Sequence, residues 1–166
     1  MSAAAPEVVS RQTRWAWWTA TFLGIGYLRP GPGTWASAET TVLWYLAASR
    51  LPASSHAIVA VAVVVAVCAI GIPASTIVER ESGRHDPGFV VIDEVAGQML
   101  AFVAVPLRWK TLLASFILFR VFDVIKPPPV RKLERLGGGT GIVLDDIGAG
   151  LYALIVVQVL LRLGVV

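Results

Sequence analysis

Three sets of carboxylates flank or interrupt apolar stretches of this chain. Asp93 and Glu94 precede one apolar stretch, Asp145 and Asp146 precede another, and Asp123 lies within a third. Charged groups at the ends of apolar helices are costly unless they are paired or bind a metal. Carboxylate oxygens, without clustered His or Cys, suit a hard cation such as Mg²⁺. The five carboxylates therefore predict a Mg²⁺ site; the alternative is that they only cap helices.

Cationic side chains accompany these acids. Arg120, Asp123 and Lys126 are spaced by three positions. On a helix, this spacing places Arg120 beside Asp123 and Asp123 beside Lys126. The prolines at 127–129 then end the helix. The two cations suit phosphate oxygens; the alternative is a row of ion pairs that neutralises itself.

Two segments rich in glycine suggest further phosphate contacts. Residues 30–37 predict a Pro/Gly loop that starts a helix, with Thr34 or Ser37 as N-cap. The free N–H groups of a helix N-terminus favour phosphate, although an ordinary turn with a cap explains the pattern as well. Glycines at 137–141 predict a second loop, whose N–H groups form an anion-binding nest. Mg²⁺ and phosphate at a bilayer surface indicate chemistry on a phospholipid headgroup.

The composition indicates that lipid surrounds the elements that carry these groups. The chain has 166 residues, 56% hydrophobic and 15% charged, with a mean hydropathy of +0.72. A soluble domain is about 25% charged. We expect an N-terminal tail over residues 1–14 and a single membrane-embedded domain over 15–166. The net charge of +3 and the lack of a basic run exclude nucleic-acid binding.

Uncharged stretches predict the membrane helices. Residues 57–78 carry no charge, and 22 residues cross about 30 Å of hydrocarbon. Residues 147–161 form a second such stretch. The sequence therefore predicts an all-α integral membrane bundle of about four to five embedded helices. Three shorter apolar stretches either tilt, borrow flanking residues or enter only partway, and they are residues 40–49, 95–107 and 111–125. Tryptophans in residues 15–28 are typical of the membrane interface.

Basic residues predict the orientation. If residues 1–34, 79–94 and 126–146 share one side, that side carries nine Lys and Arg residues and the opposite side four. The side with more basic residues is usually cytoplasmic, so the carboxylates should face the cytoplasm. The nine are Arg11, Arg14, Arg29, Arg80, Arg84, Lys126, Arg131, Lys132 and Arg135.

Four segments resemble, in order, motifs of the phosphatidylglycerophosphatase A family. They are PGTWAS at 32–37, IDEVAG at 92–97, FRVFDVIKPPP at 119–129 and GGTGIVLDDIGAG at 138–150. Ala36 stands where the family usually has glycine. The resemblance implies an all-helical enzyme of the bacterial inner membrane. It also implies Mg²⁺-dependent hydrolysis of phosphatidylglycerophosphate to phosphatidylglycerol and phosphate in phospholipid biosynthesis.

Chemistry then suggests roles for these residues. A metal-activated water is the expected nucleophile, because Cys68 lies mid-span and His85 is the one histidine on the predicted cytoplasmic side. Glu94 is the candidate general base or a further ligand, and Asp93 and Asp123 are also expected to be catalytic. The expected metal ligands, direct or through water, are Asp93, Asp123, Asp145 and Asp146. The expected phosphate-binding residues are Arg120, Lys126, Thr34, Ser37, Gly138, Gly139, Thr140 and Gly141.

Other functions remain open from the sequence. Acids within membrane helices also occur in transporters and channels. A non-catalytic assembly protein could use its charges only to fix helix register. A phosphatidyl transferase also uses acids and Mg²⁺, but the D-G-x-x-A-R start and the spaced aspartates of that class are absent. The oligomeric state and the acyl-chain preference stay open.

Overall fold

The chain folds entirely into helices where its structure is described. The computed structural model describes residues 12–133 and 136–166, and this part of the chain contains no strand. The expected all-α fold is confirmed. The α-helices are α1 (Arg14–Ala20), α2 (Pro32–Ala48), α3 (His56–Ser82), α4 (Ile92–Ala101), α5 (Trp109–Ile125), α6 (Val130–Leu133) and α7 (Gly138–Arg162), with 3-10 helices η1 (Ile25–Tyr27) and η2 (Ala53–Ser55). Arg11, Arg135 and the first eleven residues of the expected tail lie outside the described residues.

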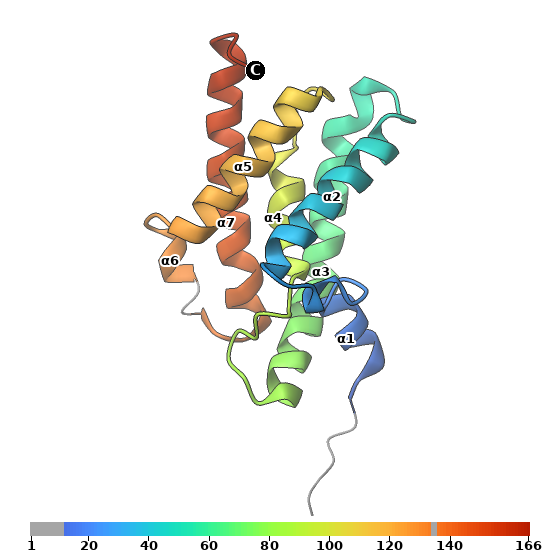
Figure 1. Ribbon diagram of the computed structural model, residues 1–166, viewed down its shortest axis with the longest axis vertical. Coiled ribbons are helices and arrows are strands. Elements are labelled where there is room, and N and C mark those ends of the chain that lie inside the picture. Colours follow the sequence, from blue (N-terminus) through green and yellow to red (C-terminus); the bar gives the residue numbers. More distant parts are fainter. Residues whose placement is uncertain (1–11, 134–135) are drawn as a thin grey trace, which may run out of the picture.

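Helices α3 and α7 form the long axis of the molecule (Figure 1). Their 27 and 25 residues correspond to about 40 and 37 Å, more than the hydrocarbon thickness of a bilayer. Both are long and apolar enough to cross a membrane. Helix α3 extends the expected stretch at both ends and continues through Pro73. Helix α7 begins at Gly138, well before the expected apolar stretch at 147.

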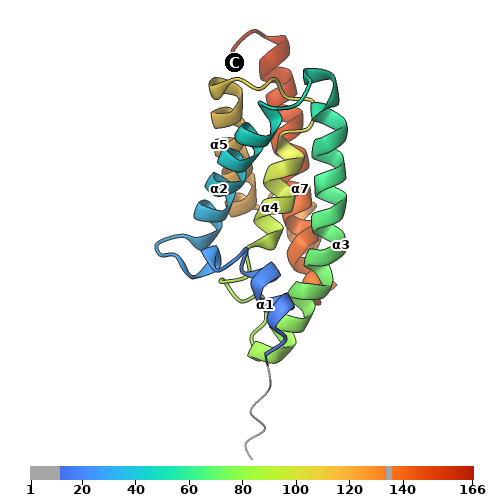
Figure 2. The same ribbon diagram turned by 90° about the vertical axis from the view of Figure 1, so that its right-hand side faces the viewer.

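Helix α4 is short and central. Its ten residues give about 15 Å, half of the hydrocarbon thickness. The expected stretch over 95–107 is therefore too long, because the helix ends at Ala101 and a turn follows. Helix α4 packs against α2, α3, α5 and α7, and Figure 2 shows it between the α2–α5 pair and the α3–α7 pair. Its first turn is consequently enclosed by other helices.

Glycines allow α4 and α7 to touch through their backbones. A Cβ on Gly150 would overlap the carbonyl oxygen of Gly97. A Cβ on Gly97 would lie 2.6 Å from the carbonyl oxygen of Asp146. Small residues of this kind permit close helix approach. The contact brings the segment that follows Asp93 and Glu94 against the segment that follows Asp145 and Asp146.

The outer surface of the long helices is apolar. Exposed large side chains occur along each of them, and in α3 they include Ile58, Val65 and Ile70, each at least half exposed. An apolar outer surface of this extent is unusual for a soluble monomer. In Figure 1 the connection after α3 lies at the lower end of the helices and the one after α5 lies at about mid-height, whereas the connections after α2 and α4, and the end of α7, lie at the top. Among the described residues, the segments expected to share one side therefore lie below those expected on the other.

Candidate active site

Glu94 lies at the centre of a network of buried polar contacts. It is in the first turn of α4 and only 9% exposed. The guanidinium of Arg120, on α5, forms an ion pair with its Oε2. The hydroxyl of Ser37, on α2, donates to the same oxygen over 3.2 Å. A Cβ on Gly33 would overlap its Oε1. The carboxylate of Glu94 is therefore where α2, α4 and α5 meet.

Arg120 connects this network to a second carboxylate. Its Nη1 lies 3.0 Å from Oδ2 of Asp123, one helical turn further along α5. The predicted pairing of Arg120 with Asp123 is confirmed. One guanidinium thus holds Glu94 and Asp123 close together, and a planar guanidinium suits two such directed contacts.

Lys126 contacts α7. It follows the last residue of α5 and has a left-handed backbone conformation, with φ of 47°. The prediction that Lys126 continues the helix at i+6 is therefore wrong, because the chain turns there before the three prolines. Its ammonium lies 2.5 Å from Oδ2 of Asp145. Non-glycine residues at positive φ often occur at functional sites, and this one aims a cation at the carboxylates of α7.

Asp145 and Asp146 lie inside α7, not at its N-terminus as the sequence predicted. Both are buried. The charge of Asp146 acts on Asp93, Glu94, Asp123 and Asp145, so all five predicted carboxylates belong to one electrostatic cluster. These five acids, on α4, α5 and α7, have two cationic partners among the described ion pairs, Arg120 and Lys126. The cluster therefore carries more negative than positive charge when its acids are ionised.

Two oxygens in this cluster lack a hydrogen-bond partner. They are Oδ1 of Asp93 and Oδ2 of Asp146, both buried. An unpartnered buried carboxylate oxygen is costly and calls for an explanation. A divalent cation fits the donor chemistry and the excess negative charge. Within residues 12–133 and 136–166, however, no three His, Cys, Asp or Glu side chains converge in a metal-binding arrangement. The four expected ligands are thus gathered near one another but are not assembled around an ion.

Burial changes the acidity of the α4 carboxyls. Desolvation raises the pKa of Glu94 to about 7, and the charge of Asp123 adds to this, whereas Arg120 and Ser37 act in the opposite direction. Desolvation, with the charge of Glu94, also raises the pKa of Asp93. A carboxyl with a pKa near neutrality is able to take up or release a proton at cellular pH. Glu94 therefore has the acidity expected of a general base.

The predicted phosphate-binding segments are only partly in this cluster. Ser37 reaches it, but α2 begins at Pro32, so neither Ser37 nor the exposed Thr34 is its N-cap. The expected glycine loop is the first turn of α7. Gly139 packs so closely on α3 that a Cβ would overlap the carbonyl oxygen of Ile72, and its N–H donates to Thr76 over 3.0 Å. This turn, which contains Gly138, Gly139, Thr140 and Gly141, precedes Asp145 by about 6–11 Å along the helix axis.

Sequence reasoning missed two further polar residues, Asp86 and Gln98. Asp86 lies in the loop before α4, at φ of 44°, and its charge acts on Asp93. Gln98, one turn beyond Glu94, is fully buried, and neither its Oε1 nor its Nε2 has a hydrogen-bond partner. The signal for Gln98 was available, because an amide four positions after a buried acid shares its helix face. No spacing rule relates Asp86 to the other acids.

Comparison with known proteins gives a consistent result. The family model for Phosphatidylglycerophosphatase A matches residues 18–161. A phosphatidylglycerophosphatase A of Haemophilus influenzae is 38% identical over 83% of each chain. One of Escherichia coli is 36% identical over 74% of this chain and 69% of its own. A Bacteroides thetaiotaomicron protein, provisionally named as a phosphatidylinositol-3-phosphatase, is 37% identical over 84% of this chain and 89% of its own. No solved structure matches significantly.

Proposed function

The chain belongs to the phosphatidylglycerophosphatase A family, and from this premise we propose that it hydrolyses phosphatidylglycerophosphate to phosphatidylglycerol and inorganic phosphate. The observation that carries the proposal is the contact of Arg120 with Glu94 and Asp123 in a buried carboxylate cluster. This arrangement combines a cationic group suited to phosphate with a carboxyl whose pKa lies near neutrality. Both features favour hydrolysis of a phosphomonoester at cellular pH.

Arg120 and Lys126 bind the terminal phosphate in this proposal. Without substrate, their charges are held by carboxylates of α4, α5 and α7. The phosphoryl oxygens compete for the same N–H groups, which are already oriented at the cluster. Cations in a site that excludes water stabilise the charge that spreads over these oxygens during transfer.

Glu94 accepts a proton from the attacking water. The new bond forms between the water oxygen and phosphorus, while the bond from phosphorus to the glycerol oxygen breaks. The proton returns to the departing glycerol oxygen, so atoms and charge balance. Ser37 donates to Glu94 and holds its carboxylate in place, which preserves the orientation that proton transfer requires.

We assign the expected cofactor, Mg²⁺, to Asp93, Asp123, Asp145 and Asp146. The unpartnered oxygens of Asp93 and Asp146 support this assignment. When bound, Mg²⁺ would lower the pKa of water and offset the charge of the phosphoryl oxygens. Without a bound cation, the negative charge of the aspartates repels anions from the cluster.

We place the protein in the bacterial inner membrane as a multi-pass protein, with the cluster facing the cytoplasm. Two apolar helices long enough to cross the hydrocarbon core support this placement, as do the apolar outer surface and the basic residues of the segments expected to share one side. Phosphatidylglycerophosphate and membrane lipid are then the partners of the protein. The acids do not run through the middle of α3, which argues against an ion path along that helix.

Phosphate release by the purified protein tests the function. We expect release from phosphatidylglycerophosphate in detergent micelles containing Mg²⁺, and at least about 100-fold less from Glu94→Gln. Glu39→Gln is the matched control, since Glu39 is exposed on α2. Phosphatidylinositol 3-phosphate serves as the rival substrate. Preference for that lipid, or ion flux into vesicles without phosphate release, would contradict the proposal.

A further inference from the structure

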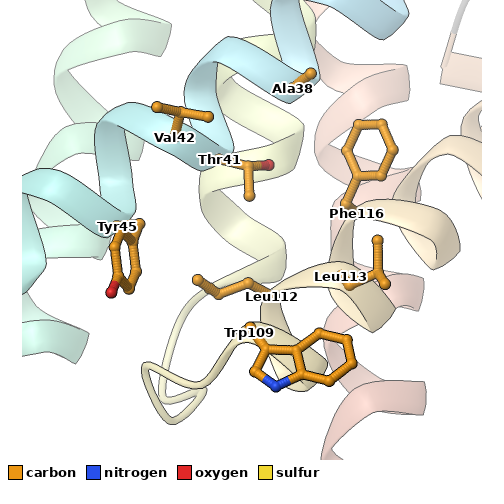
Figure 3. A pocket seen from close by; sticks show the side chains of 8 residues that line it. All are labelled: Ala38, Thr41, Val42, Tyr45, Trp109, Leu112, Leu113 and Phe116. Carbon is orange, nitrogen blue, oxygen red and sulfur yellow. The ribbon is translucent and has the colours of Figure 1, made fainter.

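An apolar groove lies between α2 and α5. It has a volume of about 360 Å³, within the range of small-molecule sites. Four lining residues come from α2 and four from α5, and Figure 3 shows their side chains converging from the two helices. They are Ala38, Thr41, Val42, Tyr45, Trp109, Leu112, Leu113 and Phe116.

One end of the groove adjoins the carboxylate cluster. Ala38 follows Ser37, whose hydroxyl donates to Glu94. Phe116 lies one helical turn before Arg120 on α5. Helices α2 and α5 run in opposite directions, so both of these residues mark the same end. From there the lining residues extend seven positions along each helix, to Tyr45 and Trp109, which is about 10 Å.

The hydroxyl of Thr41, which lines the groove, is not available to a ligand. Its hydroxyl donates to the carbonyl oxygen of Ser37 over 2.8 Å, and its methyl group lies toward Leu112 (Figure 3). The helical backbones on both sides satisfy their own N–H and C=O groups. An extended peptide would leave its own polar groups unpaired here, whereas a hydrocarbon chain would not. The groove is also open laterally, because Val42 and Leu113 are about half exposed.

We propose that this groove holds the part of one acyl chain nearest the glycerol of the lipid substrate. The proposal rests on the proposed function and identifies the part of the protein that recognises the lipid. In a bilayer the chain is already in an apolar solvent, so the groove contributes little by hydrophobic transfer. It acts by position: a chain fixed beside Ala38 and Phe116 brings the phosphate of the same molecule to Arg120.

Filling the groove tests this role. We expect Val42→Trp to lower kcat/KM for dioleoyl phosphatidylglycerophosphate about ten-fold. For the deacylated substrate, glycerophosphoglycerophosphate, kcat/KM should stay unchanged. Val65→Trp is the matched control, since Val65 is likewise exposed but lies on α3, away from the groove. Equal losses for both substrates, or no loss for either, would overturn the proposal.

A second measurement separates this proposal from the proposed function. Phosphatidylglycerol with a diazirine near the ester end of one chain, in phosphatidylcholine vesicles, should label Val42, Leu113 or Phe116. If the wild type hydrolyses neither substrate, the proposed function fails, and the labelling still decides whether a chain occupies the groove. Labels confined to α3 and α7 would overturn the proposal. Disulfide-linked dimers of Leu113→Cys in a Cys68→Ser background would also overturn it, by placing a second copy over the groove.

Discussion

At the residue scale, Arg120 is both a proposed phosphate-binding residue and a structural contact between helices. It contacts one carboxylate from α4 and one from its own helix, and the residue is partly buried. A guanidinium makes several directed contacts in one plane, whereas an ammonium is a single point charge. The side chain therefore fixes the spacing of Glu94 and Asp123 before any phosphate arrives.

Arg120→Lys should consequently lower kcat/KM for phosphatidylglycerophosphate at least about ten-fold, although the charge is retained. Phosphate release measured over a range of substrate concentrations checks this. Arg50→Lys, at an exposed position beyond α2, is the control and should behave like the wild type. Wild-type kinetics for Arg120→Lys would show that Arg120 does not grip the phosphate through two contacts.

Asp146 illustrates how function opposes stability. Its Oδ2 is buried without a partner, and its charge acts on four neighbouring carboxylates. Asp146→Asn removes a charge that costs stability when no cation is bound. We expect hydrolysis to fall about 100-fold, while Tm in EDTA rises by about 2–4 °C, the change that 1 kcal/mol makes in a chain of this size.

Thermal unfolding in a fixed detergent, followed by circular dichroism, measures this second effect. Glu39→Gln, an exposed carboxylate exchanged for its amide, should leave Tm unchanged. A large fall in Tm for Asp146→Asn would mean that the carboxylate stabilises the fold, and the assignment of its orphaned oxygen to a cation would lose its support.

At the element scale, the contact between α4 and α7 determines which carboxylates meet. Gly97 and Gly150 let the two backbones touch. A side chain at either position would push the helices apart. Helix α4 carries Asp93 and Glu94, and helix α7 carries Asp145 and Asp146. The distance between these two pairs of carboxylates therefore depends on the two glycines.

Gly150→Ala should therefore reduce activity, although Gly150 carries no side chain that could take part in the reaction. We expect a loss of about 1–3 kcal/mol of stability from overpacking and at least about ten-fold lower kcat/KM from the displaced carboxylates. Gly148→Ala is the control on the same helix, since its Cβ would meet the side chain of Val130 instead of backbone. Both quantities come from unfolding curves and phosphate release. Equal effects of the two substitutions would contradict the account.

The sequence predicted the long helices well, because an uncharged stretch of this length has few alternatives. It misplaced the start of α7 because four glycines in residues 137–141 suggested a loop. In the structure, Gly139 allows a helix to pass against Ile72, and such packing depends on a neighbour 67 residues away in the chain. The end of α4 was missed as well: the chain turns after Ala101, and Ala104 adopts a positive φ of 55° that no pattern in the sequence indicates.

The sequence predicted most of the residues of the site but fewer of the contacts between them. Glu94, Arg120 and Asp123 were expected to act together, and Arg120 does contact both carboxylates. The partner of Lys126 on α7 was not expected, because the turn at Lys126 depends on its positive φ. Asp86 was not assigned either, since its proximity to the cluster results from the path of a loop. Spacing rules describe neighbours within a helix and do not extend to such contacts.

At the scale of the whole molecule, exposed apolar side chains line the long helices, and nine of the 14 Lys and Arg residues belong to the sequence segments expected to share one side. This distribution predicts a defined orientation in the inner membrane. In a Cys68→Ser background, His85→Cys and Ser54→Cys place exposed cysteines in the connections at opposite ends of α3. A membrane-impermeant maleimide should label Ser54→Cys in intact spheroplasts, and His85→Cys only after permeabilisation. The reverse pattern would place the carboxylate cluster outside the cell.

In the proposed mechanism, the carboxylates of α4, α5 and α7 act with a divalent cation on a lipid phosphate. Its most direct test is phosphate release from phosphatidylglycerophosphate by the purified protein, first with Mg²⁺, then after EDTA, and again after Mg²⁺ is restored. We expect EDTA to reduce release at least about 100-fold and added Mg²⁺ to restore it. Undiminished release in EDTA would contradict this mechanism.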